Sequence, residues 1–121
     1  DLEALARSLD MDVLAEVHNA TELDRALGLE TNLIGINNRN LKTLQVDLRT
    51  TLELAPLVPP DRFVIAESGI RRHEDLIMLS QTGVKCFLVG EFLMRQPDVA
   101  QAARELLGSQ TPARSARAKA G

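Results

Sequence analysis

The sequence predicts an α/β protein in which parallel strands alternate with helices. Four short apolar runs each end in a polar or charged cluster, and each is followed by a stretch in which apolar residues recur at helical spacing. The chain has no Trp or Tyr, so its core must be built mainly from Leu, Val, Ile and Ala, which suits tightly layered strands. This alternation favours a parallel sheet with right-handed crossovers, and 121 residues suffice for one domain.

The chain opens with a predicted helix, because Leu2, Leu5 and Leu9 recur at helical spacing. No room is left for a strand before this helix, and the chain starts at Asp1 without Met. We therefore expect that the chain was cut from a longer protein or processed.

The first apolar run, residues 13–15, leads to a predicted helix between Asn19 and Gly28. Asn19 and Glu22 resemble a capping box, and Gly28 is a plausible stop. The residues expected to face inward are Leu23, Ala26 and Leu27. The second run, residues 33–36, follows.

A longer polar segment, residues 37–46, separates the second strand from its helix. Asp47 can cap that helix, and the prolines from Pro56 to Pro60 end it. The residues expected to face inward are Leu48, Thr51, Leu52 and Ala55. The third run is residues 63–66.

The remaining predicted elements are a helix over 71–82 closed by Gly83, a strand over 86–89, a short helical turn over 90–94 and a last helix. We expect Pro97 to be the first residue of that helix. The inward residues predicted for the two long helices are Leu76, Leu79 and Ser80, and then Val99, Ala102, Ala103, Leu106 and Leu107. The domain is expected to cover 1–108, with a disordered basic tail at 109–121.

Composition excludes several function classes. The net charge is −3 and the basic tail makes the remainder more acidic still, which together with the lack of Trp and Tyr argues against nucleic-acid binding. The single cysteine, Cys86, allows no disulfide within the chain and fits a cytoplasmic protein. No apolar run approaches the ~18 residues that span a membrane, and no signal peptide is visible.

Glu16 follows the first apolar run and is a candidate general base, because partial burial raises the pKa of a carboxyl group toward neutrality. A strand-end acid paired with a neighbouring Lys or Arg explains the residue equally well. His18 is expected to be a loop residue or a support for Glu16. The sequence shows no second His or Cys at ligand spacing, so we predict no metal site.

The segment from Gly35 to Leu41 is the most specific part of the sequence. Asn37, Asn38 and Asn40 surround Arg39 directly after a predicted buried strand. Asn can hold a hydroxyl or carboxylate, and Arg can clamp a carboxylate or phosphate. A turn explains the asparagines but explains Arg39 less well.

Two weaker signals follow the third and fourth strands. Glu67, Ser68 and Gly69 could hold a substrate or a phosphate, and Gly90-Glu91 precedes a short helix whose N–H groups could face a phosphate. A capping serine and turn glycines explain the same residues. Arg71-Arg72 is more simply a solvated helix start than a phosphate clamp.

Four segments in order, residues 15–18, 34–41, 66–70 and 88–94, together resemble the carboxyl-terminal half of indole-3-glycerol phosphate synthase. The resemblance covers about 1–107. It implies a (βα)8 TIM barrel, of which this chain holds the fifth to eighth strands. It also implies a lyase of tryptophan biosynthesis that converts 1-(2-carboxyphenylamino)-1-deoxyribulose 5-phosphate to indole-3-glycerol phosphate, losing carbon dioxide and water, without a metal or organic cofactor.

The resemblance also implies site residues. Glu16 matches the catalytic glutamate, Asn37 the asparagine that positions substrate and that glutamate, and Arg39 the arginine on the substrate's carboxylate side. The family's lysines from earlier strands, one of them its general acid, have no counterpart here. We therefore expect this chain alone to be inactive.

The remaining matches lie at the last two strand ends. Glu67 and Ser68 match substrate-contacting residues, and Gly69, Gly90 and Glu91 fall where the family's backbone binds phosphate. The expected partners are the phosphorylated substrate and the missing amino-terminal half barrel. Two alternatives remain open: a self-associating half-barrel module, and a related phosphate-binding barrel such as phosphoribosylanthranilate isomerase.

Overall fold

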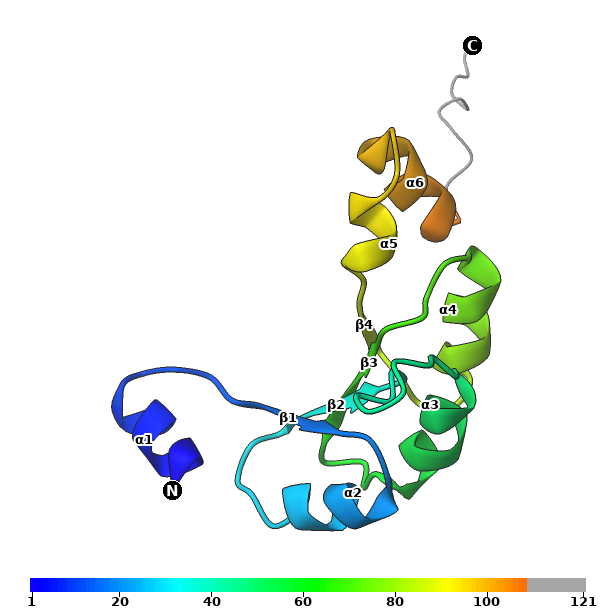
Figure 1. Ribbon diagram of the computed structural model, residues 1–121. Helices are drawn as coiled ribbons and strands as arrows, with labels where there is room; N and C mark the ends of the chain where they lie inside the picture. The colour runs from blue at the N-terminus through cyan, green and yellow to red at the C-terminus, as the bar shows by residue number, and fades with distance from the viewer. Residues whose placement is uncertain (109–121) are drawn as a thin grey trace.

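The computed structural model describes residues 1–108, so the tail expected at 109–121 lies outside the described residues. Its centre is a four-stranded parallel sheet in which sequence neighbours are also spatial neighbours, in the order β1-β2-β3-β4 (Figure 1). The strands are β1 (Leu14–Val17), β2 (Leu33–Asn37), β3 (Phe63–Glu67) and β4 (Cys86–Leu88). All three pairings are parallel, which confirms the fold class predicted from the alternation of apolar runs.

The two faces of the sheet differ in what covers them. Successive side chains of a strand point to opposite faces, and the register aligns Val17 with Ile36 and Ile36 with Ala66, all at most 1% exposed. We call this the helix face. The open face carries Leu14, Glu16, Leu33, Gly35, Asn37, Phe63, Ile65, Glu67, Cys86 and Leu88. Leu14, at the amino end of β1, and Leu88, at the carboxyl end of β4, are 42% and 56% exposed on the open face, so both side chains are partly uncovered.

The helices that follow the strands build the core. They are α2 (Ala20–Ala26), α3 (Arg49–Leu54, continued by the 3-10 turn η1, Ala55–Leu57), α4 (His73–Ser80), α5 (Glu91–Met94) and α6 (Val99–Leu106). Leu23 of α2, Leu54 of α3 and Leu79 of α4 join the helix-face residues in one buried cluster. Figure 1 shows α5 and α6 beyond the end of β4, above α4.

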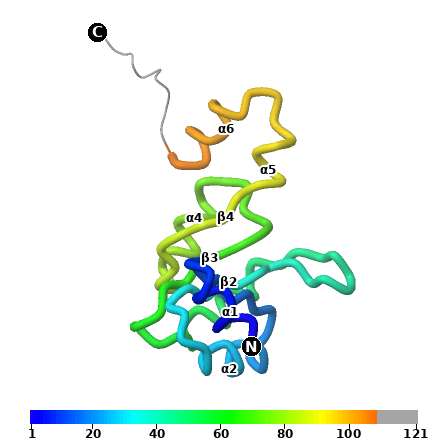
Figure 2. Tube along the Cα trace, turned by 90° about the vertical axis from the view of Figure 1, so that its left-hand side faces the viewer, coloured from blue at the N-terminus to red at the C-terminus, as the bar shows by residue number. Residues whose placement is uncertain are grey.

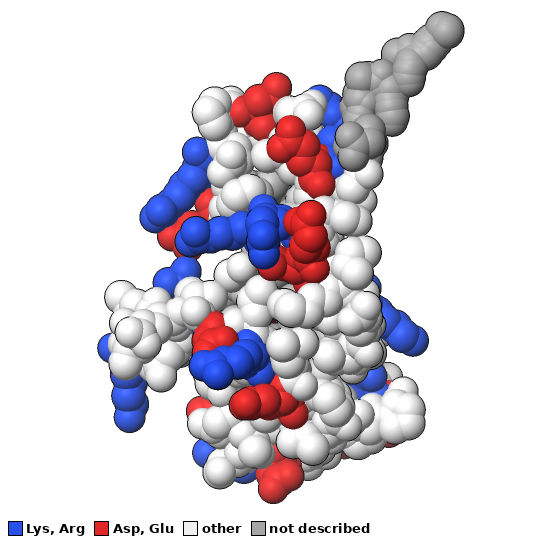
Figure 3. Space-filling view, turned by 90° about the vertical axis from the view of Figure 1, so that its right-hand side faces the viewer, with Lys and Arg blue, Asp and Glu red and all other residues white. Residues whose placement is uncertain are grey.

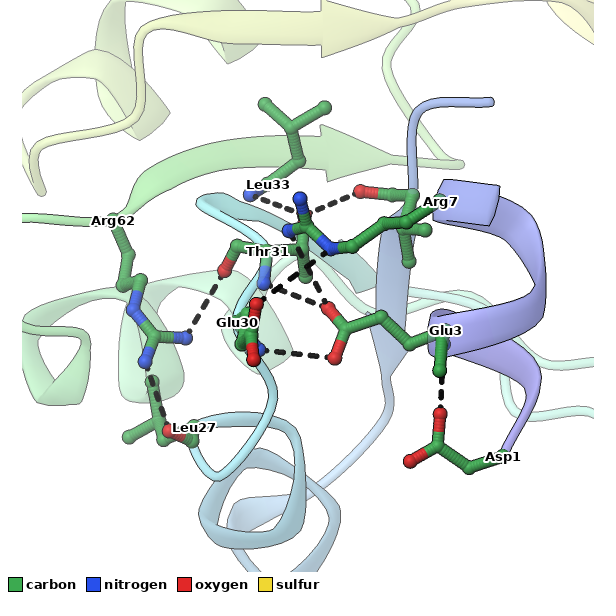
Figure 4. Close-up of polar contacts among 10 residues, drawn as sticks. Asp1, Glu3, Arg7, Leu27, Glu30, Thr31, Leu33 and Arg62 are labelled. Atoms are coloured by element: carbon green, nitrogen blue, oxygen red, sulfur yellow. Dashed lines mark hydrogen bonds and ion pairs between the residues drawn. The ribbon is translucent and has the colours of Figure 1, made fainter. Parts of the chain in front are cut away.

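Helix α1 (Leu2–Ser8) stands apart from the other helices (Figure 1) and has no buried residue. Polar contacts hold it in place: the Glu3 carboxylate accepts hydrogen bonds from the backbone N–H groups of Glu30 (3.0 Å) and Thr31 (2.8 Å) (Figure 4). Arg7 adds ion pairs to Glu3 and Glu30. The predicted opening helix is confirmed, but Leu2 is 83% exposed, so its apolar face lies uncovered.

The chain between β2 and α3, which we call loop 38–47, projects away from the sheet as the cyan-green extension in Figure 2. An antiparallel bridge joins Arg39 to Val46 at its base. Near its tip the Asn40 side chain accepts hydrogen bonds from the N–H groups of Lys42 and Thr43. The predicted polar turn is therefore present, although Leu44 within it is 64% exposed.

Several predicted boundaries were wrong. The first three strands extend past their apolar runs, so Glu16, Asn37 and Glu67 lie within β1, β2 and β3 rather than after them, whereas β4 ends at Leu88, one residue before the predicted strand over 86–89. The last helix begins at Val99, because the Asp98 side chain caps it by accepting from the Gln101 N–H (3.0 Å), and Pro97 precedes that cap.

Three predicted inward residues are also exposed. Ser80 is exposed, and Val99 and Leu107 are 49% and 71% exposed. The predicted capping box is half realised. Asn19 accepts from the Glu22 N–H, but the Glu22 carboxylate accepts from the N–H of His18 instead.

The surface in Figure 3 is the side on which α3 and α4 lie in Figure 1. Acidic and basic side chains are interspersed over it, without a continuous basic patch on this face. Within residues 1–108, every helix is too short or too polar to cross a lipid bilayer.

Candidate active site

A cleft of about 620 Å³ lies where β3 and β4 end. It gathers six of the eight residues predicted from the sequence: Arg39, Glu67, Ser68, Gly69, Gly90 and Glu91. The other two, Glu16 and Asn37, do not line it but are connected to it by hydrogen bonds. The structure thus brings the four strand ends together at one edge of the sheet, as parallel strands require.

Asn37 links the cleft to Glu16. Its Oδ1 accepts hydrogen bonds from Ser68 Oγ (2.8 Å) and from the Arg39 N–H (2.9 Å). Because the Arg39 N–H can only donate, the amide orientation is fixed and Nδ2 faces Glu16. Nδ2 donates to Glu16 Oε2 at 3.1 Å. One face of the sheet therefore presents a hydroxyl, an amide and a carboxylate in a connected row.

Glu67 is the buried acid of the site. The Glu67 side chain lies over Gly35, and Glu67 is only 4% exposed. Burial, and then the nearby Glu16 carboxylate, raise the pKa of Glu67 from its ordinary 4.5 to about 7. Glu67 Oε2 has no hydrogen-bond partner among the described residues. A carboxyl group in this setting can hold a proton near neutral pH and release it when a neighbouring charge changes.

Glu16 is 41% exposed at its side chain and has His18 as a second neighbour. His18 Nε2 lies 3.4 Å from Glu16 Oε2, and His18 Nδ1 lies 3.0 Å from Glu22 Oε1. The His18 hydrogen bond lowers the pKa of the Glu22 carboxyl. His18 thus stands between two carboxylates, as expected for a support of Glu16.

Two successive residues of the turn after β3 have positive φ, and of the two only Ser68 is strained, because glycine adopts such angles without steric cost. Ser68 has φ +72° and Gly69 has φ +81°. A side chain at position 69 would collide with Val46 of loop 38–47, so glycine is required there for space as well as for conformation. This close packing places the base of the loop against the turn that carries Ser68.

Three arginines line the cleft: Arg39, Arg71 and Arg95. Glu91 holds two of them, with its carboxylate 2.8 Å from Arg39 and 2.9 Å from Arg95. Arg39 also donates to the Leu44 carbonyl (3.1 Å). Arg71, which the sequence favours as solvated, thus borders the cleft. The cationic side chains can hold an anionic group, and Glu91 balances part of their charge in its absence.

Sequence reasoning named Gly35 and Asn38 in the most specific segment and correctly predicted that Thr51 faces inward, but it gave none of the three a role in the site. Strand alternation could have indicated the roles of Gly35 and Asn38, since Gly35 shares a face with Asn37 while Asn38 must point the opposite way. Among residues 1–108, no cluster of three or more His, Cys, Asp or Glu side chains could hold a metal ion.

Comparison with known proteins shows which family the sequence of this chain matches. The sequence pattern that defines indole-3-glycerol phosphate synthase matches residues 1–106. The chain belongs to the indole-3-glycerol phosphate synthase family. The synthase of Azospirillum brasilense is 57% identical over 107 residues, which are 88% of this chain and 41% of that protein. The synthase of Albidiferax ferrireducens is 57% identical over 109 residues, covering 90% of this chain and 41% of the relative.

A solved structure supports the barrel class. A mutant mandelate oxidase carrying a monooxide FMN adduct superposes with a TM-score of 0.58 at 26% identity, over 88% of this chain and 34% of that one. The chain spans about two fifths of the length of its synthase relatives and matches their carboxyl-terminal part. Four parallel strands alternating with helices are thus part of a TIM barrel, which confirms the fold predicted from the resemblance.

Proposed function

We propose that this chain supplies the carboxyl-terminal half of an indole-3-glycerol phosphate synthase active site. The observation that carries the proposal is the row of Ser68, Asn37 and Glu16, which runs from an arginine-lined cleft to a carboxylate beside the buried Glu67. The proposed reaction is the decarboxylating, dehydrating ring closure of 1-(2-carboxyphenylamino)-1-deoxyribulose 5-phosphate. This substrate carries a carboxylate and a phosphate, and both need cationic or N–H partners.

The proposed roles follow from position. Glu16 is the proton-handling carboxylate, and Asn37 orients it by donating to Oε2. A positioned carboxylate of this kind contributes about 10²–10⁴-fold to a rate. Ser68 and Glu67 border the substrate, and the Glu16 carboxylate helps to raise the pKa of Glu67 because two neighbouring carboxyl groups resist being charged together.

Arg39 would take the carboxylate side of the substrate, and the turn at Gly69 together with Gly90 and Glu91 would border its phosphate. Arg71 and Arg95 line the same cleft and add positive charge to it. In this proposal the backbone of Glu91 borders the phosphate, but its carboxylate does not bind the anion. It keeps the Arg39 and Arg95 side chains extended until the anion arrives.

The chain alone is proposed to be inactive. The two lysines of the described residues, Lys42 and Lys85, do not line the cleft. Lys42 lies in loop 38–47, and Lys85 borders a separate pocket with Asn32 and Pro60, next to the amino ends of the strands. A lysine acid must therefore come from elsewhere, and the partner proposed for this is the amino-terminal half barrel. A cytoplasmic location also stays a proposal, in keeping with the free thiol of Cys86.

The test is reconstitution. The portion of the A. brasilense synthase that precedes its match is joined to this chain, and indole-3-glycerol phosphate formation is measured by absorbance and mass spectrometry. We refer to this fusion as the assembled enzyme. Product is expected from the assembled enzyme and not from this chain alone. A folded assembled enzyme that binds substrate but makes no product would contradict the proposal.

A second role is favoured by one observation, the partly exposed apolar residues of the open face. Such a face promotes association, either with the other half of a barrel or with a second copy of the chain. The related isomerase considered from the sequence is not proposed, because the matching family pattern is that of the synthase.

A further inference from the structure

Asn38 follows Asn37 directly but points the opposite way. It continues the helix-face series Ile34, Ile36, and it is 2% exposed. An amide in an apolar layer is costly unless its polar atoms are paired. The alternation of the strand predicts an aliphatic side chain at this position, so burial alone does not explain why an asparagine is present.

Every polar group of Asn38 has a partner. Oδ1 accepts from the Thr51 N–H (3.1 Å) and from Thr51 Oγ1 (2.7 Å), and Nδ2 donates to the Ser68 carbonyl (3.0 Å). Its backbone N–H donates to the Glu67 carbonyl (2.9 Å), and its carbonyl accepts from the Asp47 N–H (2.9 Å). Because the Thr51 N–H can only donate, the direction of the Asn38 amide is fixed, with Nδ2 toward Ser68.

The carbonyl that Asn38 holds belongs to the strained residue of the site. Ser68 has φ +72°, a conformation that costs a non-glycine residue free energy and persists only where its surroundings impose it. The same conformation turns Ser68 Oγ toward Asn37 Oδ1, and Asn37 then holds Glu16. The two neighbouring asparagines thus act on opposite faces of β2, and Ser68 joins them.

We propose that Asn38 and Thr51 form a positioning pair that holds the Ser68 peptide, and through Ser68 and Asn37 sets the orientation of Glu16. Neither residue of the pair lines the cleft, and the pair ties the first turns of α3 to the catalytic edge of the sheet. This inference rests on the proposed function, because its consequence is catalytic. Thr51 is fully buried, so its hydroxyl has no solvent to replace it as a donor.

The test uses Thr51→Val in the assembled enzyme, since valine keeps the approximate size of threonine and replaces its hydroxyl with a methyl group. Thr51→Ser restores the hydroxyl. Thr82→Val is the matched control, because the Thr82 hydroxyl donates to the Leu79 carbonyl (2.7 Å) and borders the pocket next to the amino ends of the strands. The measurements are kcat, KM, the pH profile of kcat and the midpoint of thermal unfolding.

Thr51→Val is expected to lower kcat about tenfold, to change KM less than threefold and to shift the pH profile, because displacing a positioned group by a fraction of an ångström costs rate rather than affinity. Thr51→Ser should recover most of kcat, and Thr82→Val should lower the unfolding midpoint alone. If Thr51→Val loses stability as Thr82→Val does but keeps kcat and its pH profile, the pair is structural only and the inference is wrong. If the unsubstituted assembled enzyme is itself inactive, the proposed function has failed instead.

Discussion

The carboxylate of Glu67 occupies the place that a β-carbon at position 35 would take. Glycine at position 35 on β2 therefore allows the Glu67 carboxyl group from β3 to lie across the open face of the sheet. There it approaches Glu16 of β1, which is paired with Gly35. Since φ of Gly35 is not positive, the requirement is for space and not for backbone conformation.

Gly35→Ala should displace Glu67 and lower both kcat/KM and stability. We expect at least a tenfold loss of kcat/KM in the assembled enzyme and a loss of about 1–3 kcal/mol in the free energy of unfolding, typical of overpacking. The control is Gly35→Ala in a Glu67→Ala background. There the collision is absent, so the added methyl group should cost little stability. Equal costs in both backgrounds would show that Glu67 is not the group displaced.

The pKa of Glu67 predicts how stability depends on pH. A carboxyl pKa raised from 4.5 to about 7 means that the folded chain keeps a proton that the unfolded chain releases. The associated stability is fully present below pH 4.5 and is lost as the pH rises to about 7, by on the order of 1–3 kcal/mol. Glu67→Gln should lack this decline.

Urea unfolding followed by circular dichroism at pH 5, 6, 7 and 8 measures the difference. The carboxyls of Glu3, Glu22 and Asp47 have lowered pKa values, so their contributions change at more acidic pH and do not obscure this window. Parallel curves for the two proteins between pH 5 and 7 would contradict the shift.

Much of the fold follows from periodicity, and the exceptions have local causes. The apolar run at residues 33–36 predicts β2 and its parallel neighbours, because buried strands need such runs. It does not show that Asn37 still belongs to the strand, since a polar residue can occupy a strand position when a hydrogen bond holds it, as Glu16 does here. Similarly, Pro97 suits a first helical turn, but Asp98 offers a better cap and moves the start.

The site was less predictable than the fold. Motifs indicate Glu16, Arg39 and Ser68, because their chemistry is visible in the sequence. They do not indicate that Glu67 is the buried partner, since its burial depends on a glycine on another strand. Nor do they reveal that Glu91 contacts Arg39, a pair separated by 52 residues.

Glu16→Gln tests the assignment of the proton-handling carboxylate. The amide keeps the shape and can still contact Asn37, but it cannot take a proton, so kcat of the assembled enzyme should fall about 10²–10⁴-fold while the fold is kept. Glu22→Gln is the control, because that carboxylate contacts the other nitrogen of His18. A near-normal rate for Glu16→Gln, with intact circular dichroism, would show that another group moves the proton.

Glu91→Gln tests the idea that Glu91 balances the arginines until an anion binds. Removing its charge frees Arg39 and Arg95, so inorganic phosphate should bind the assembled enzyme more tightly. Because Glu91 is 56% exposed at its side chain, the gain should be modest, about two- to fivefold in Kd. Isothermal titration with phosphate at fixed ionic strength measures it. Weaker phosphate binding by Glu91→Gln would instead show that Glu91 helps to build the anion site.

The open face predicts how this chain behaves without the rest of a barrel. Leu14, Phe63 and Leu88 are 42%, 39% and 56% exposed on a single side of the sheet, where water contacts them. Burying such a patch is favourable by roughly 25 cal/mol per Å² of apolar surface, so the isolated chain should self-associate at micromolar concentration. Sedimentation velocity should show dimers or larger species, and the amino-terminal portion of the A. brasilense synthase, added separately, should convert them to a one-to-one complex.

A substitution on the open face distinguishes self-association through that face from nonspecific association of exposed apolar side chains. Leu88→Ser should shift the sedimentation profile toward monomer, because it removes an exposed leucine from the open face. Leu107→Ser, which alters an exposed leucine just after α6, should leave the profile unchanged. A monodisperse monomer for the unsubstituted chain, with little binding of a hydrophobic dye, would contradict association through this face. An equal shift with both variants would mean that exposed leucines in general, and not the open face, drive association.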